Sequence, residues 1–256
     1  MGASNLKRLS SKSNKGEPVL PTFTKKVMSS SLIKPTSLNE VLSLSAPFYF
    51  HDFRGENIEI FHSDILRNEG IDVTFIRDSV SVSKKDVLRG LHGDFSTWKL
   101  ISCLSGSIYL AVADLRAASS SFLKWEGFHL SAENRRQILV PPGVANGHLV
   151  LSDSALFFYK LSFNHDRSSQ FTVRWDDPAL GIYWPTRSPV LSERDAGLDP
   201  TAPLLDLSNY RQHHDYPRRM PHVAFHVISD TSINSSAQLA ADSSTNEIID
   251  IQGDFS

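Results

Sequence analysis

Short apolar runs rich in β-branched and aromatic residues recur along the middle of the chain. Such runs predict β-strands. The predicted strands cover residues 58–61, 73–76, 99–104, 107–114, 128–130, 137–140, 148–151 and 156–161. Residue pairs that favour turns separate them, among them Ser105-Gly106, Pro142-Gly143 and Ser152-Asp153. No ten-residue amphipathic helix lies between them, so parallel βαβ units are not expected.

The regular spacing of these short strands predicts an all-β fold. A sandwich or a barrel would fit, and the double-sheet jelly roll is the leading form. Helices are expected to be minor, with one predicted around residues 191–198. The strand-rich region defines one domain over residues 41–210.

Both ends of the chain differ in composition from this domain. Residues 1–40 form a basic leader rich in serine and lysine, and residues 211–256 form a polar tail. Such segments bury too little apolar surface to offset the entropy of ordering, so both are predicted to be disordered extensions. Import into organelles also uses a basic, serine-rich, acid-poor N-terminus, so a transit peptide is the alternative for the leader.

The composition of the whole chain narrows the classes of partner. Of its 256 residues, 40% are hydrophobic and 21% are charged, and the formal net charge is −2. Neither nucleic acid nor an anionic membrane surface is therefore expected as a partner. No apolar run approaches the roughly 20 residues of a membrane-spanning helix. The single cysteine, Cys103, allows no intrachain disulfide, which together with the lack of a secretory signal favours the cytoplasm.

Two of the predicted strands place a polar side chain among inward-facing apolar ones. Alternate residues of a strand share a face, so Lys99 lies on the face of Ile101, and Tyr159 lies on the face of Phe157. A buried lysine is costly unless it faces a wet cavity or an anion, so the pair indicates an internal pocket. In the alternative interpretation, the tyrosine is a hydrogen-bonded core residue and the lysine reaches out of the barrel mouth.

The clustered histidines that hold a metal in many jelly-roll proteins are incomplete here. The stretch His92-Gly-Asp94 has one histidine where such a metal site has a His-x-His pair. The second metal motif would begin at Pro141, but it has Asn146 in place of the histidine, with His148 two residues on. A metal-free site is therefore predicted. A lone histidine in a loop after a glycine is more often structural than catalytic, so His92 taken alone identifies no function.

Eight short motifs, taken together, resemble those of one family. They cover residues 83–92, 114–116, 130–137, 158–160, 175–178, 180–182, 184–185 and 191–195. The first reads SKKDVLRGLH and the last LSERD, and in this order they are similar to the dTDP-4-dehydrorhamnose 3,5-epimerases. The resemblance covers about residues 50–205. It implies a cupin-like jelly roll (a double-stranded β-helix), a homodimer, a nucleotide-sugar substrate, and neither a metal nor an organic cofactor.

The resemblance also implies catalytic roles for four residues. His92 matches the general base, Asp195 its carboxylate partner, Tyr159 the general acid and Lys99 the lysine beside the keto oxygen. These residue types suit the reaction, because a 4-keto group acidifies the protons on C3 and C5. A base can remove such a proton, an acid can return one to the opposite face, and an ammonium group can stabilise the enolate between the two steps.

Eight further positions match substrate-binding positions of the family. They are Arg54, Glu59, Arg77, Ser79, Arg89, Asn146, Gln170 and Arg194. Several depart from the usual pattern. The family commonly has Ala-His-Gly-Phe where this chain has Ala-Asn146-Gly-His148, and a Gln-x-Asn pair where it has Arg77 and Ser79. At the positions of Gln170 and Arg194 the family commonly has Glu and Lys.

The leading hypothesis is epimerisation of dTDP-4-dehydro-6-deoxy-D-glucose at C3 and C5, which gives dTDP-4-dehydro-L-rhamnose. The proton-transfer residues are intact and the recognition residues are altered. A single-centre epimerase, or an enzyme for a different nucleoside-diphosphate 4-keto sugar, is therefore the second hypothesis. A catalytically silent jelly roll that binds a sugar nucleotide is the third. A metal-dependent oxygenase is a remote fourth.

Overall fold

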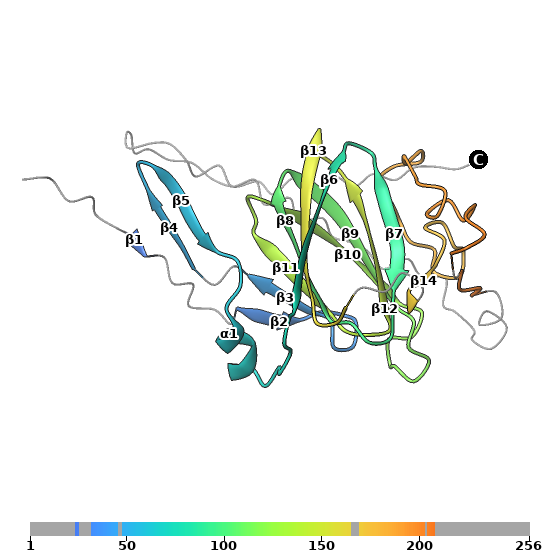
Figure 1. The fold of residues 1–256 in the computed structure, drawn as a ribbon, viewed down its shortest axis with the longest axis horizontal. Helices are drawn as coiled ribbons and strands as arrows, with labels where there is room; N and C mark the ends of the chain where they lie inside the picture. The colour runs from blue at the N-terminus through green and yellow to red at the C-terminus, as the bar shows by residue number, and fades with distance from the viewer. Residues whose placement is uncertain (1–23, 26–31, 46–47, 165–168, 203, 208–256) are drawn as a thin grey trace, which may run out of the picture. The chain divides into compact units, whose positions relative to one another are not determined.

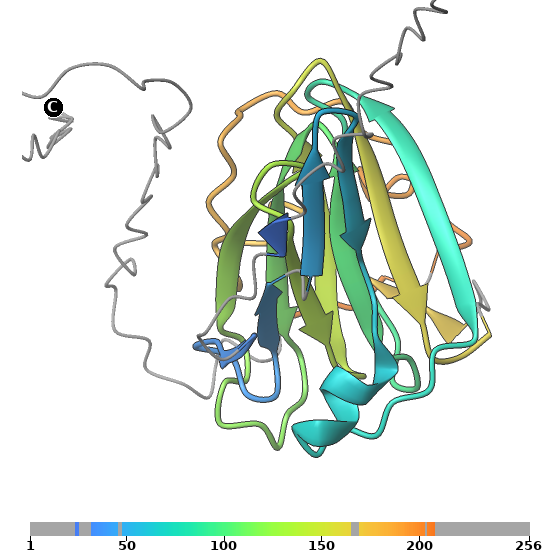
Figure 2. The same ribbon diagram turned by 90° about the vertical axis from the view of Figure 1, so that its left-hand side faces the viewer.

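The computed structural model describes residues 24–25, 32–45, 48–164, 169–202 and 204–207. All of them belong to the first of two units into which the chain divides, Met1–Tyr216. Two antiparallel β-sheets pack face to face in this unit, and three short strands near the N-terminal end of the described residues form a small third sheet (Figure 1, Figure 2). The predicted jelly roll is therefore confirmed.

The larger of the two facing sheets has six strands in the order β2-β3-β11-β8-β13-β6. Their bounds are Ile33–Pro35 (β2), Leu42–Ser45 (β3), Arg136–Val140 (β11), Lys99–Ser105 (β8), Ser154–Leu161 (β13) and Arg77–Lys84 (β6). The facing sheet has five strands in the order β10-β9-β12-β7-β14. Its bounds are Trp125–Ser131 (β10), Ser107–Asp114 (β9), Val144–Val150 (β12), Leu88–Gly93 (β7) and Phe171–Thr172 (β14).

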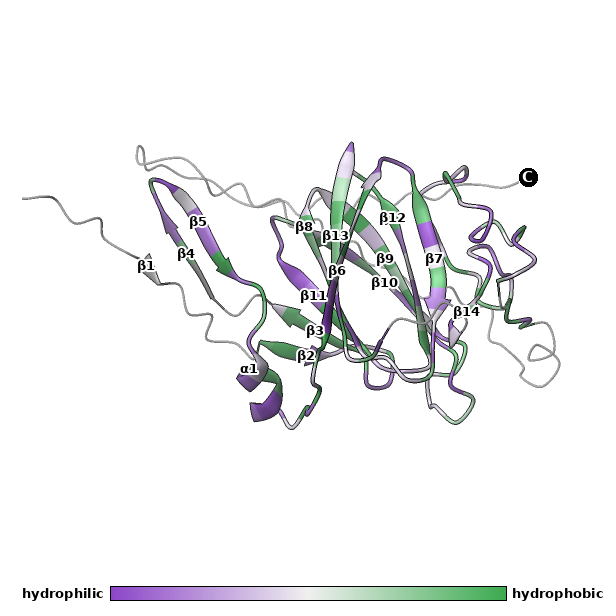
Figure 3. Ribbon diagram, in the orientation of Figure 1, coloured by the Kyte–Doolittle hydropathy of each residue, from purple (hydrophilic) through white to green (hydrophobic). Residues whose placement is uncertain are grey.

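The third sheet consists of β1 (Thr24–Lys25), β4 (Phe48–Asp52) and β5 (Gly55–Glu59). β4 and β5 form a hairpin, with Asp52 opposite Gly55. One short helix, α1 (Ser63–Asn68), follows the hairpin and leads toward β6. Its first turn is capped by His62, whose Nδ1 accepts a hydrogen bond from the backbone N–H of Asp64. The helix is largely hydrophilic (Figure 3).

The apolar strand β9 is buried on both faces, which explains its nearly continuous apolar sequence. Ile108, Leu110 and Val112 join the cluster between the two sheets. Tyr109, Ala111 and Ala113 join a second cluster on the other face of the same sheet. A strand covered on both faces needs no polar alternation, so its sequence reads as one apolar run.

The segment that follows β14 covers the outer face of the five-stranded sheet. Val173, Leu180, Trp184 and Leu207 contribute to the second cluster, and the indole of Trp184 donates a hydrogen bond to the carbonyl oxygen of Trp175 at 2.8 Å. Burial of these side chains, each worth roughly 1.5–3 kcal/mol, fixes a segment that has little regular structure of its own. This packing also brings residues 192–199 to the pocket described below.

Four predicted strands, over residues 99–104, 107–114, 137–140 and 156–161, are confirmed to within about two residues as β8, β9, β11 and β13. The strand predicted over residues 128–130 is part of the longer β10, and the one predicted over residues 148–151 coincides with the end of β12, which starts earlier and stops at Val150. The strand expected at residues 58–61 lies slightly earlier, as β5.

Two predicted elements are wrong. Residues 73–76 form no strand; they connect α1 to β6, and Phe75 is held there by an edge-to-face contact with Phe61, with 5.5 Å between ring centroids. Residues 191–198 form no helix but consecutive turns. These turns have isolated backbone hydrogen bonds, such as the one that the N–H of Ala196 donates to the carbonyl oxygen of Ser192 at 2.9 Å. Gly197, at φ +72°, leaves the helical region and ends these turns.

The domain boundaries are only partly within the described residues. Ile33–Pro35 form β2 of the six-stranded sheet, so regular structure begins before residue 41, the predicted start of the domain. Most of the leader and the tail from residue 211 lie outside the described residues. Within the described part of the chain, no helix has the length and apolar character needed to cross a bilayer.

Candidate active site

A pocket of about 570 Å³ opens among strands of the two facing sheets. Its walls come from β6, β7, β8, β12 and β13, and from residues 192–199. The inner faces of β8 and β13 carry apolar core residues, and at this end of the sandwich they change to Lys99 and Tyr159. A large cavity with a few converging polar groups is the usual form of a small-molecule site.

A glycine allows β7 to approach β12 closely beside this pocket. Gly90 has φ +119°, and a Cβ atom at this position would lie 2.5 Å from the Cα of Gly147. Only glycine fits such a backbone approach. The register between the two strands also shifts between Asn146 and His148. His92 therefore lies in a strand and not in a loop, directly opposite Asn146.

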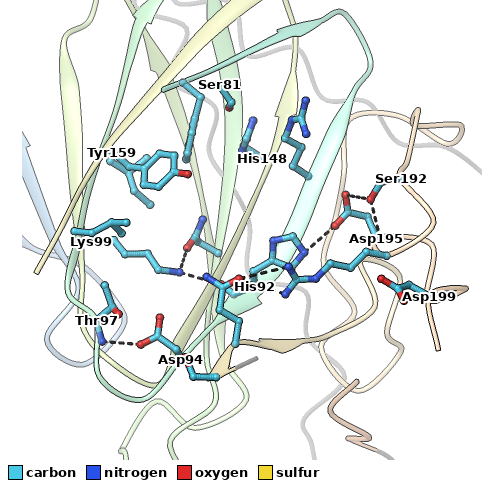
Figure 4. A pocket seen from close by; sticks show the side chains of 18 of the residues that line it. Ser81, His92, Asp94, Thr97, Lys99, His148, Tyr159, Ser192, Asp195 and Asp199 are labelled. Carbon is cyan, nitrogen blue, oxygen red and sulfur yellow. Dashed lines mark hydrogen bonds and ion pairs between the residues drawn. The ribbon is translucent and has the colours of Figure 1, made fainter. Parts of the chain in front are cut away.

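His92 and Asp195 form the tightest charged contact in the pocket. The Nε2 atom of His92 lies 2.8 Å from Oδ1 of Asp195, whose side chain is 4% exposed. The same carboxylate accepts hydrogen bonds from the Ser192 hydroxyl at 2.7 Å and from the Gly90 backbone N–H at 3.2 Å. Figure 4 shows Asp195 behind His92, on the side away from Lys99 and Tyr159.

The surroundings of the pair favour an ionised carboxylate and a neutral imidazole. Burial by itself would raise the pKa of Asp195, but His92, Ser192 and the Gly90 N–H together lower it below its ordinary value. Burial lowers the pKa of His92, and nearby Arg194 adds to this effect, whereas Asp195 raises it; the net shift is downward. A neutral imidazole oriented by a carboxylate is the form that acts as a general base.

Lys99 is a buried cation that points into the pocket (Figure 4). Its ammonium group donates hydrogen bonds to Oδ1 of Asn146 at 2.9 Å and to the carbonyl oxygen of His92 at 3.2 Å. Burial lowers the pKa of Lys99 to about 8, partly opposed by the negative charge of Asp94. Because both acceptors are neutral, the positive charge is available to a substrate oxygen.

Tyr159 lines the pocket from β13 and points its hydroxyl into it (Figure 4). Its ring packs against Phe157, with 5.3 Å between ring centroids. The inward placement predicted for Lys99 and Tyr159 from strand alternation is therefore confirmed. It brings an ammonium group, a phenol and a histidine–carboxylate pair to one cavity.

The residues matched to substrate binding fall into two groups. Four line the pocket, namely Arg89, Asn146, Gln170 and Arg194. Arg89 also donates from Nε to the Ser83 hydroxyl at 3.0 Å, and Arg194 donates from Nε to the Thr172 hydroxyl at 2.9 Å. The other four do not line it. Arg77 and Ser79 lie on β6, and Arg54 and Glu59 lie on or beside the β4–β5 hairpin.

Several pocket residues were not among the sequence candidates. Ser81, Asp94, His148 and Ser192 all line the cavity. Two signals could have identified some of them. Residues 146 and 148 share a strand face, and Ser192 lies within the LSERD motif beside Asp195. Asp94 accepts hydrogen bonds from the backbone N–H groups of Ser96 and Thr97, so it also shapes the turn after β7.

The arrangement defines a class of enzyme. A neutral imidazole, a phenol and an ammonium group around one cavity suit proton removal and return at a carbon next to a carbonyl. Within the described residues no group of three or more His, Cys, Asp or Glu side chains is placed to hold a metal ion. The fold and the site together are those of a jelly-roll isomerase.

The chain belongs to the dTDP-4-dehydrorhamnose 3,5-epimerase family, whose model matches residues 35–202. It is 40% identical over 180 residues to the enzyme of that name from Salmonella typhimurium, covering 68% of this chain and 96% of the relative. It is also similar to a dTDP-4-dehydrorhamnose 3-epimerase from Streptomyces niveus, at 30% identity over 167 residues (64% of this chain and 80% of the relative). A solved structure from Legionella pneumophila, a dTDP-6-deoxy-D-glucose-3,5-epimerase in complex with dTDP-4-keto-L-rhamnose, has a TM-score of 0.62 and 34% identity, and covers 68% and 98% of the two chains.

Proposed function

We propose that this chain epimerises dTDP-4-dehydro-6-deoxy-D-glucose at C3 and C5 to give dTDP-4-dehydro-L-rhamnose. The observation that carries the proposal is the convergence of His92–Asp195, Lys99 and Tyr159 on one cavity. Membership of the family supports the choice of substrate.

In the proposed reaction, the sugar carbonyl oxygen faces the ammonium group of Lys99. His92 takes the proton from the carbon next to the carbonyl, and the electron pair of the broken C–H bond moves onto the oxygen to form an enolate. Tyr159 then donates a proton to the opposite face of that carbon, and the carbonyl re-forms with inverted configuration. The proton on His92 passes to solvent, and Tyr159 regains one from solvent, so the enzyme returns to its starting state.

The remaining pocket residues are proposed to bind the rest of the nucleotide sugar. Arg89 and Arg194 lie on the walls that flank His92, and their guanidinium groups can each pair with two diphosphate oxygens. Asn146 and Gln170 are neutral and suit sugar hydroxyls. Arg77 and Ser79 are proposed to act at the β6 side of the cavity, where Ser79 lies opposite Tyr159 in the ladder.

We further propose that the chain works as a homodimer. Among the described residues, β6 ends the six-stranded sheet with no strand paired to its outer edge, and it turns Val80 and Val82 outward, 59% and 68% exposed. An exposed sheet edge that turns apolar side chains outward is a candidate surface for contact with another chain. Arg54 and Glu59 do not line the pocket of their own chain, so their substrate-binding role is proposed to act in the partner's pocket.

Subunit complementation tests this arrangement. Arg54→Ala and His92→Ala should each be inactive alone. In mixed dimers, one pocket pairs an intact His92 with an intact hairpin of the partner, so an equal mixture should recover about a quarter of wild-type activity. Recovery of no activity, although co-purification of differently tagged subunits shows that mixed dimers form, would refute the exchange of hairpins.

The first test of the activity is proton NMR of dTDP-4-dehydro-6-deoxy-D-glucose with the purified protein in D₂O. Deuterium should enter at C3 and C5, and His92→Ala should abolish both exchanges. Exchange at C3 or C5 alone would support the single-centre alternative, which the departures at Asn146, Arg77 and Ser79 favour. No exchange would contradict the proposal, and the CDP- and GDP-sugars would then test for a different nucleotide.

The proposed location is the cytoplasm, because the free thiol of Cys103 favours a reducing compartment. Cell fractionation would test this location.

A further inference from the structure

His148 is a buried side chain of the pocket wall that the proposed reaction does not use. It is 3% exposed and lines the cavity from β12. Its ring stacks on Phe157 with 4.0 Å between centroids and an interplanar angle of 8°. Among the described residues its imidazole has no hydrogen-bond partner, and Nε2 is fully buried. Figure 4 shows it on the same wall as His92, with no interaction drawn to it.

An unpaired imidazole in this position has a cost. Leaving a buried polar group without a hydrogen bond destabilises a protein, so such groups in native structures nearly always have a partner. A phenylalanine would keep the stacking on Phe157 without this cost. The imidazole is therefore better explained by a partner that enters the pocket.

The strand geometry places His148 beside the reacting groups. Residues 146 and 148 share the pocket face of β12, and they lie opposite His92 and Arg89 of β7. The Oδ1 atom of Asn146 is already engaged by Lys99 at 2.9 Å. Of the two polar side chains that β12 contributes, His148 is thus the one whose hydrogen-bonding capacity is unused.

The charge state of His148 limits what it can do. Burial lowers its pKa to about 3, and the nearby positive charge of Arg89 adds to this effect. At neutral pH the ring is therefore uncharged, with one nitrogen as donor and the other as acceptor. It cannot neutralise a phosphate, and at this pKa it is a poor base. A hydroxyl group, which both donates and accepts, is the matching partner.

We propose that His148 is a specificity-determining residue whose imidazole hydrogen-bonds a hydroxyl of the sugar ring, at C2 or C3, beside the carbonyl held by Lys99. This inference rests on the proposed function of the pocket. It implies that the sugar contact from β12 comes from residue 148, two residues after Asn146 on the pocket face of the strand.

The test compares His148→Phe with wild type on three substrates: the dTDP-4-keto-6-deoxy sugar and its 2-deoxy and 3-deoxy analogues. The readout is kcat/KM for deuterium exchange at C5, a carbon that all three share. Wild type should prefer the parent sugar to one analogue by about tenfold, and His148→Phe should lose that preference, since a neutral hydrogen bond is worth roughly a factor of 2 to 13. His148→Gln, which keeps a donor and an acceptor, should retain part of it.

Two controls separate this role from a structural one. His129→Phe makes the same change at an exposed position on β10 and should leave the preference intact. The melting temperature of His148→Phe should equal or exceed that of wild type, because an unpaired buried polar group is removed. An unchanged preference, or an equal loss on all three substrates, would overturn the proposal. Failure of wild type to exchange any of the three would instead contradict the proposed function.

Discussion

Replacing Asp195 with asparagine isolates the contribution of one charge to the proposed base. The substitution keeps the shape of the side chain and an acceptor for the Gly90 N–H, but removes the negative charge 2.8 Å from Nε2 of His92. Two opposite unit charges about 4 Å apart attract by about 4 kcal/mol at an effective dielectric constant of ~20. If the imidazole carries about half a positive charge in the transition state, about 2 kcal/mol is lost, or roughly a 30-fold fall in kcat/KM.

The pH dependence of kcat/KM tests the same substitution, because the direction in which its acidic limb moves can be predicted. The base must be neutral, so activity falls at acidic pH as His92 is protonated. Asp195 is the group that raises the pKa of His92, whereas burial, Arg194 and Lys99 lower it. Removing the carboxylate leaves only the lowering influences. The acidic limb of kcat/KM should therefore move to lower pH in Asp195→Asn, while the rate on the plateau falls.

The assay is the rate of deuterium entry at C3 and C5, measured between pH 5 and 9, with a melting curve to confirm that the variant is folded. Asp153→Asn, an Asp-to-Asn change at an exposed loop position, is the matched control. A plateau within about threefold of wild type, or an acidic limb that moves to higher pH, would refute the assignment of His92 as a base supported by Asp195.

Three further changes test other parts of the structure. Lys99→Met should lower kcat/KM by about 10²–10³, and it should abolish the fall in activity that wild type shows as pH rises through about 8, where Lys99 loses its proton. Tyr159→Phe should slow inversion by about 10²–10⁴ while solvent exchange at the carbon persists, because His92 can still remove and return a proton on its own face; NMR distinguishes exchanged starting sugar from the epimer. Asp114→Asn should reduce the free energy of unfolding by about 3–5 kcal/mol, because Arg116 would lose its buried carboxylate partner at 2.9 Å, with kcat unchanged in the folded fraction; urea denaturation measures this.

Strand alternation predicted the inward placement of Lys99 and Tyr159 because it depends only on local geometry. In β8 and β13 every second residue is apolar and buried, so a lysine and a tyrosine in the same register had to face inward too. The jelly roll was predictable for the same reason, since strand length and turn spacing are local properties.

The contact between His92 and Asp195 could not be derived from local pattern. The two residues are 103 positions apart, and the carboxylate is held in place by Gly90 and Ser192 through bonds that exist only in the folded chain. This tertiary fixation also explains the wrong prediction of a helix at residues 191–198: the charges and spacing suit a helix, but the Asp195 side chain is committed to the pocket and the backbone closes in turns. The resemblance to a family, not periodicity, paired the two residues.

The edge strand β6 was missed because its pattern is the reverse of the usual one. Its serines face inward, where Ser81 lines the pocket and Ser83 is buried, and its valines face outward. A rule that places apolar residues inside would turn these valines toward the core, whereas here the inner face borders a polar cavity. Contact with another chain would explain why the valines face outward. One face of β6 thus borders the pocket, and the other face is proposed to contact the partner subunit. A substitution such as Val82→Lys should therefore both separate the subunits and weaken substrate binding. If the two faces were independent, the subunits would separate without a change in substrate binding.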